Sequence, residues 1–190
     1  MIRLPFHLVL LLALVLLGAL GCASTTTFQL TPAPQDPVCK RSATVEVFWV
    51  TRWRADQKDV AAREAAVAAG IGQFFEASRC FQSTSVRRLD IDSKEAVQAA
   101  VAQATARNAR MVLIAVRELG PSVKIGASLA LVEGATEVVL DISEFDPAKP
   151  EVRTFTAAWR NGGAGVIKGV ATLVQDMQAA LAASLQPTAH

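Results

Sequence analysis

The sequence predicts one α+β domain in which helices pack on a mixed sheet that contains an antiparallel meander. Two observations predict this fold. Segments rich in β-branched and aromatic residues alternate with segments of helical apolar spacing, and four strand candidates in the second half are separated only by short turns. The 190 residues suffice for one domain with its own core. The expected order of elements is β-α-β-α-β-β-β-β-α, a layered fold for which α/β is the alternative label.

The first half of the domain is predicted to contain two strand–helix units. A strand over 44–50 is apolar on both faces towards its end, which is typical of an interior strand. A helix over 56–78 follows, with an apolar stripe opposite a polar face. A short strand over 84–89 then precedes a second helix over 92–107. This second helix is rich in Ala and Gln, so we expect it to pack lightly on the sheet.

The second half is predicted to contain four strands and one helix. The strand patterns fall at 111–116, 123–131, 138–142 and 152–159. The first of these is an uninterrupted apolar run, which is typical of a central strand. Turns are expected at Gly120-Pro121 and at Glu133-Gly134. The last helix is expected from Ile167 to Leu185, where apolar side chains recur three and four residues apart.

An amino-terminal leader ends in a cysteine. Residues 1–21 contain Arg3 and an uncharged apolar run from Leu8 to Leu20, which is shorter than the ~20 residues of a membrane-spanning helix. Ala19-Leu20-Gly21-Cys22 resembles the bacterial lipobox, which implies cleavage before Cys22 and lipidation of its thiol. The alternative is an ordinary cleaved signal peptide followed by a chance cysteine.

The lipobox resemblance implies a place in the cell envelope. Ala23 follows the cysteine, in place of the aspartate that resembles an inner-membrane retention signal, so we expect the periplasmic face of the outer membrane. Residues 22–40 are rich in Thr, Pro and Ala and lack periodicity, which predicts a flexible tether. The folded domain is expected over 41–187, held at the membrane by the lipid on Cys22.

Two further cysteines form an even pair in an oxidising compartment. Cys39 precedes the first predicted strand, and Cys80 follows the helix after it. Because that helix returns the chain to the end of the sheet where the strand began, both thiols are expected at one edge. A Cys39–Cys80 disulfide is therefore predicted. The alternative is two free thiols that pack as small hydrophobic side chains.

The composition argues against several classes of chemistry. His7 lies in the leader and His190 is the last residue, so the predicted domain offers no histidine for a triad, a zinc site or a general base. The sequence shows no motif for a metal, a nucleotide cofactor or an activated nucleophile. A formal net charge of +2 gives no electrostatic argument for nucleic acid as a partner. We expect no catalytic residue, no metal and no cofactor.

A short basic and aromatic cluster follows the first predicted strand. Trp53 lies between Arg52 and Arg54, and these side chains together suit contact with lipid headgroups, glycans or a protein partner. The alternative is an amphipathic loop that only caps the sheet. The three residues are the candidate partner-contact site.

Three short segments carry a resemblance to a group of envelope proteins: GQFFEASRCF at 72–81, NARMVLI at 108–114 and VLDISEFD at 139–146. With the order of elements from residue 44 onward, they resemble the amino-terminal domain of TolB. That fold is shared by the curli-secretion channel lipoprotein, the lipoprotein activators of penicillin-binding proteins and GNA-type surface lipoproteins. Pro147-Ala-Lys-Pro150 departs from the usual Thr-Gly between the last two strands.

A second resemblance is to the auxiliary lipoprotein of ABC-type envelope transporters. FQLTPAP at 28–34 resembles the segment after its lipobox, and Glu144-Phe145-Asp146 with TAAWR at 156–160 resembles a strand pair of that family. Both resemblances imply a non-catalytic accessory lipoprotein that binds an unidentified envelope protein complex. A third hypothesis is a carrier of a lipid or another apolar ligand, in a cleft beside the lightly packed second helix.

Overall fold

A computed structural model describes residues 24–90, 93–125, 132–149 and 151–186. The strands in these residues are β1 (Thr25–Thr31), β2 (Thr44–Thr51), β3 (Ser83–Arg88), β4 (Arg110–Ile125), β5 (Val132–Phe145) and β6 (Arg153–Ala164). The helices are α2 (Val60–Ala77), α3 (Lys94–Ala106), α4 (Leu173–Leu185) and a short 3₁₀ turn, η1 (Val170–Thr172). None of the described helices is long and apolar enough to cross a membrane.

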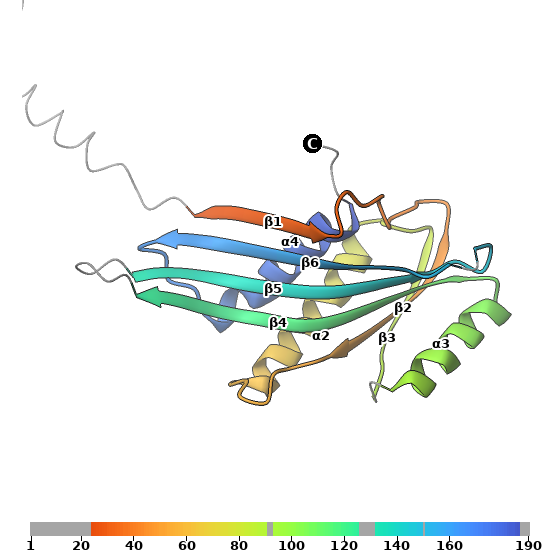
Figure 1. Ribbon diagram of the computed structural model, residues 1–190, viewed down its shortest axis with the longest axis horizontal. Coiled ribbons are helices and arrows are strands. Elements are labelled where there is room, and N and C mark those ends of the chain that lie inside the picture. Colours follow the sequence, from red (N-terminus) through yellow and green to blue (C-terminus); the bar gives the residue numbers. More distant parts are fainter. Residues whose placement is uncertain (1–23, 91–92, 126–131, 150, 187–190) are drawn as a thin grey trace, which may run out of the picture.

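The strands form one mixed sheet in the order β1-β6-β5-β4-β2-β3 (Figure 1). β2 pairs in parallel with β3 and β4, because α2 and α3 return the chain after β2 and β3. β4, β5, β6 and β1 pair antiparallel with their neighbours. The predicted α+β class with an antiparallel meander is confirmed.

The main core lies between one face of the sheet and the pair α2 and α4. These two helices lie together behind the sheet in Figure 1. Among its fully buried side chains, several of the largest come from β4, β5 and β6 and from both helices: Ile71, Ile114, Leu140, Ile142, Phe155, Met177 and Leu181. Gly70 of α2 lies where a Cβ would approach Met177 within 2.8 Å, so the two helices cross closely at this glycine.

The opposite face of the sheet is covered only in part. A smaller core joins α3 to β2 and β4, with Ala100 and Ala104 of the helix against Phe48, Met111 and Leu113. These two alanines are the buried residues of α3, which confirms the light packing predicted for this helix. The part of this face formed by β5, β6 and β1 carries Thr, Ser and charged side chains instead. We call it the open face.

The predicted tether over 22–40 is wrong for Thr25–Thr31, because this segment is strand β1 on the edge of the sheet. Its threonines suit an extended backbone, and Leu30 packs against the core. The backbone N–H of Val38, which is fully buried, donates to the carbonyl of Leu185 at the end of α4. The ordered part of the chain therefore begins before residue 41.

The predicted turns at Gly120-Pro121 and Glu133-Gly134 are also wrong, because β4 and β5 run through both pairs as one long hairpin. β2 ends beside Val116, so Pro121 lies where β4 has no neighbour on that side. A proline there costs the sheet no hydrogen bond. The predicted strand over 123–131 is the end of β4 up to Ile125, and residues 126–131 lie outside the described residues.

The last helix begins later than its apolar spacing predicts. Ile167 and Val170 continue the spacing of α4 towards the amino terminus, yet the helix starts at Leu173. Gly165 adopts a positive φ of 72°, and Gly169 before η1 is extended, so the chain between β6 and η1 is not helical. The stripe from Leu173 to Leu185 faces the core as predicted.

Cys39 and Cys80 form a disulfide, as the sequence predicts. Their Cα atoms lie 4.7 Å apart, and 41 positions separate them in the chain. The bond joins the segment before β2 to the loop after α2, which is the edge at which both thiols were expected. It cross-links the chain over the whole first strand–helix unit.

Candidate functional site

Ser24, the first described residue, shows where the leader joins the sheet. Ser24 directly precedes β1, and its hydroxyl donates to Asn161 Oδ1 of β6 at 2.9 Å. A row of paired residues crosses four strands at this point: Thr25, Gly162, Ala135 and Ser122. We call this the leader end of the sheet. Cys22 itself lies outside the described residues, two positions before Ser24.

The candidate contact residues after β2 divide between the surface and the interior. Trp53 is half-buried and packs against the main core. Arg52 and Arg54 are exposed and reach different partners. Arg52 lies 3.8 Å from Asp141 on the open face, and Arg54 lies 3.5 Å from Glu118 of β4. The two arginines therefore contact different partners, and the Trp53 ring between them packs the loop against the main core.

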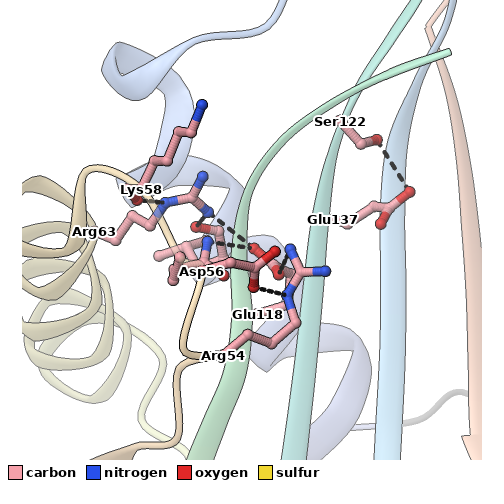
Figure 2. A network of polar contacts seen from close by, with 9 residues as sticks. Arg54, Asp56, Lys58, Arg63, Glu118, Ser122 and Glu137 are labelled. Carbon is pink, nitrogen blue, oxygen red and sulfur yellow. Dashed lines mark hydrogen bonds and ion pairs between the residues drawn. The ribbon is translucent and has the colours of Figure 1, made fainter.

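The Glu118 carboxylate forms hydrogen bonds and ion pairs with side chains of this loop and of α2 (Figure 2). Arg63 Nη1 donates to Glu118 Oε1 at 2.8 Å and to the Leu119 carbonyl at 2.5 Å, while Arg63 Nε donates to the Lys58 carbonyl. Gln57 adds a hydrogen bond to the same carboxylate at 3.2 Å. β2 pairs with β4 only up to Val116, so the Leu119 carbonyl lies on an edge of β4 that no strand covers. The buried Arg63 side chain supplies the hydrogen bond that this carbonyl would otherwise lack.

The open face carries a second polar cluster, around Asp141 of β5. Thr156 Oγ1 of β6 donates to Asp141 Oδ1 at 2.7 Å, and Arg117 lies 3.5 Å from the same oxygen. With Arg52 on the other oxygen, one carboxylate joins two arginines and a hydroxyl. The cluster is partly exposed and pairs its charges, which is typical of a solvated sheet face.

The end of the sheet opposite the leader holds two adjoining pockets, and we call it the distal end. A groove of about 470 Å³ lies beside α3, and its walls are mainly apolar. They include Val97, Val101, Met111, Phe145 and Val152. This groove lies where the sequence predicts a cleft beside a lightly packed helix.

The neighbouring pocket of about 380 Å³ is charged. Glu144 is buried in its wall between Arg110 and Arg153, and it forms ion pairs with both. Arg110 Nε also lies 3.3 Å from Asp146 Oδ2. The nearby Arg110 guanidinium is the main reason that the pKa of Lys40 is lowered, with burial adding to it. Paired in this way, the carboxylates tie β4, β5 and β6 together.

Glu144 and Asp141 face opposite sides of β5. They form no common acidic site. Within the described residues, no group of three or more His, Cys, Asp or Glu side chains is placed to hold a metal ion.

The edge strand β1 is the feature that sequence reasoning missed. It is exposed along nearly its whole length and carries neither charge nor proline. Edge strands that avoid pairing usually carry one or the other. The opposite edge, β3, ends in Arg87 and Arg88. A hollow of about 300 Å³ lies over β1, β6 and β5 next to this bare edge. The alternation of Phe28 and Leu30 with polar residues is the signal that would have indicated a strand.

Comparisons with known proteins find weak structural likeness. No family model matches this chain, and no curated protein matches it. The PelC dodecamer from Paraburkholderia phytofirmans is 17% identical, with a TM-score of 0.46, over 87% of this chain and 100% of that one. The lipoprotein GNA1162 from Neisseria meningitidis is 16% identical, with a TM-score of 0.36, over 75% of this chain and 99% of that one.

A third structure is a neuraminyllactose-binding hemagglutinin homolog from Helicobacter pylori, 12% identical with a TM-score of 0.37, over 78% of this chain and 84% of that one. The likenesses do not assign the chain to the TolB-like group, and that resemblance stays a prediction.

Replacing Gly120 by alanine should displace Arg63 and destabilise the fold. A Cβ on Gly120 would lie 1.6 Å from Arg63 Nη1, so the guanidinium would lose its bonds to Glu118 and to the Leu119 carbonyl. We expect a loss of about 1–3 kcal/mol in the free energy of unfolding, measured with urea. Gly72→Ala is the matched control. Its site in α2 is open, so it should stabilise by about 0.5–1 kcal/mol. A Gly120→Ala variant as stable as the parent would contradict this role of Arg63.

Replacing Glu64 by glutamine should remove a stabilisation that depends on pH. Burial raises the pKa of Glu64, but hydrogen bonds from Thr51 and Arg88 outweigh it, so the pKa is lowered overall. A lowered pKa stabilises the fold above the unfolded pKa of ~4.3, and the effect is lost as pH falls through the folded value.

Glu64→Gln should therefore cost about 0.5–1.5 kcal/mol at pH 7 and much less near pH 3. Urea unfolding of both proteins across this range measures the difference. Glu76→Gln, at an exposed position of the same helix, should leave stability nearly unchanged at either pH. An equal cost for Glu64→Gln at pH 7 and pH 3 would refute the assignment.

Proposed function

We propose that this protein is a lipid-anchored, non-catalytic accessory lipoprotein of the bacterial cell envelope, on the periplasmic face of the outer membrane. It acts by binding a protein partner. The single observation that carries this proposal is that β1, an exposed and uncharged edge strand, begins three residues after the lipobox cysteine Cys22.

Strand addition is the binding mode that this edge supports. An edge strand presents backbone N–H and C=O groups to which an extended segment of another protein adds as a further strand. In β1 these groups are shielded by neither charge nor proline. The open face beside it offers Arg160 and Gln29 next to a shallow hollow, where side chains of an added segment find polar contacts.

The contacts of the described residues favour a binding role over catalysis. The buried carboxylates Glu46 and Glu144 are each held by two arginines. Asp141 is likewise shared between Arg52 and Arg117. These side chains stabilise the sheet through ion pairs, because each carboxylate is paired with two arginines. Arg52 extends the partner surface from the loop onto the open face.

The kind of complex follows from the two sequence resemblances. The TolB-like resemblance favours an assembly module that serves a peptidoglycan synthase, a secretion system or a Tol-type complex. The second resemblance favours an auxiliary component of an ABC-type envelope transporter. Both need a protein partner at the membrane, so the identity of the partner decides between them.

A carrier of a lipid or another apolar ligand is the second candidate function. The observation in its favour is the apolar groove of about 470 Å³ beside α3. Pockets for small ligands have volumes of roughly 300–1,000 Å³. In this alternative α3, whose packing is light, moves to admit the ligand between its Val97 and Val101 side chains and Phe145.

A photo-crosslinking amino acid at Gln29 tests the proposal in living cells. The β1 edge should yield a protein adduct, which mass spectrometry then identifies. Ser85 on β3 is the matched control, because it is an exposed position on the other edge of the same sheet. We expect the adduct from Gln29 and none of the same mass from Ser85.

The adduct also decides among the functions. Transporter components favour the ABC-type auxiliary role, whereas a synthase, secretion or Tol-type protein favours the assembly role. Recovery of lipid without protein favours the carrier. A protein adduct from Ser85 and none from Gln29 would contradict binding through β1.

A further inference from the structure

The leader end of the sheet gathers apolar side chains that the core does not cover. Val123, at the end of β4, is 62% exposed, and Ile167, between β6 and η1, is 93% exposed. Val170 follows at 47%. Ile167 and Val170 are not buried in the core, because α4 starts only at Leu173 and the segment before it lies outside the core.

Two contacts place Val123 and Ile167 at the same end. Val123 pairs with Gly134, one position beyond the row of Thr25, Gly162, Ala135 and Ser122. A Cβ on Gly134 would lie 2.1 Å from the Val166 carbonyl and 3.6 Å from Ile167 Cα, so the segment after β6 crosses directly over this glycine. Figure 1 shows β1 starting, β4 and β6 ending, and the segment after β6 turning back, all at this side of the sheet.

The chain leaves little distance between this end and Cys22. Only Ala23 stands between Cys22 and Ser24 in the sequence, and two residues of chain span at most about 7 Å. Acyl chains on Cys22 enter the hydrocarbon of the bilayer, and the headgroup layer above it is roughly 5–8 Å thick. The first residues of β1 are therefore held next to the headgroups.

Two cations of the described residues near this end are paired with carboxylates. Lys168 Nζ lies 3.1 Å from Asp176 Oδ1, and Arg160 lies 2.9 Å from Glu133 Oε1. Ile167 therefore projects beside a lysine whose charge is already compensated. Aliphatic side chains over paired charges match the boundary between headgroups and acyl chains.

We propose that the leader end is a membrane-contacting surface, in which Ile167 and Val123 enter the bilayer interface beside the lipid on Cys22. The inference rests on the proposed lipid anchor and deepens it. The anchor fixes the orientation of the domain: the leader end faces the bilayer, and the distal groove and charged pocket face away from it.

Fluorescence quenching by lipids tests this orientation. The full lipidated protein is reconstituted into phosphatidylethanolamine and phosphatidylglycerol vesicles that contain doxyl-labelled lipid. A single cysteine at Ile167→Cys or Val123→Cys carries an environment-sensitive dye, attached without reductant so that the Cys39–Cys80 disulfide stays closed. Val152→Cys is the matched control, since it is an exposed valine (50%) in the β5–β6 turn at the distal end.

We expect doxyl lipid to quench the dyes at 167 and 123 about two-fold or more, relative to the dye at 152. If the dyes at 167 and 123 escape quenching while the protein is bound to vesicles, the surface contact is overturned and the anchor stands. Equal quenching at 152 overturns the orientation. If the mature protein carries no lipid and does not bind vesicles, the proposed function fails, and the inference falls with it.

Discussion

The pairing of β1 with β6 is the interaction on which the arrangement of the whole molecule depends. It joins the residues immediately after the leader to the sheet, so a lipid on Cys22 would hold the fold itself instead of a loose tether. Backbone hydrogen bonds along 7 residues make this connection, helped by Leu30 against the core. A pulling force on a lipid at Cys22 would therefore act directly on β1 and, through its hydrogen bonds, on the long antiparallel strand β6.

The sheet has two unlike ends. At the leader end, β4, β5 and β6 extend beyond β2, and exposed aliphatic side chains lie at the end of β4 (Val123) and after β6 (Ile167 and Val170). At the distal end, the Arg110–Glu144–Arg153 cluster ties the strands together beside the groove at α3. Between the two ends, Arg63 donates a hydrogen bond to the Leu119 carbonyl, where β4 would otherwise present a free edge. In the proposed function, the membrane contact lies at the leader end, and the partner binds along the exposed edge of β1.

Local sequence signals predicted the elements that bury their own apolar residues. The interior strand β2, the central run of β4, the stripes of α2 and α4 and the Cys39–Cys80 disulfide all follow from such signals. β1 was missed because its threonines gain stability only from a partner strand distant in sequence. Gly120-Pro121 resembles a turn, and nothing local shows that β2 ends early enough to tolerate the proline. Candidate sites that depend on such long-range neighbours, the β1 edge above all, became visible only in the fold.

The proposed lipid anchor is tested by the intact mass of the mature protein extracted from membranes of the producing cell, together with the sequence of its amino-terminal peptide. We expect an amino terminus at Cys22 that carries acyl chains, and a Cys22→Ser variant that folds but leaves the membrane fraction. Cleavage elsewhere with an unmodified Cys22 thiol, or a Cys22→Ser protein that stays in the membrane fraction, would contradict the lipid anchor.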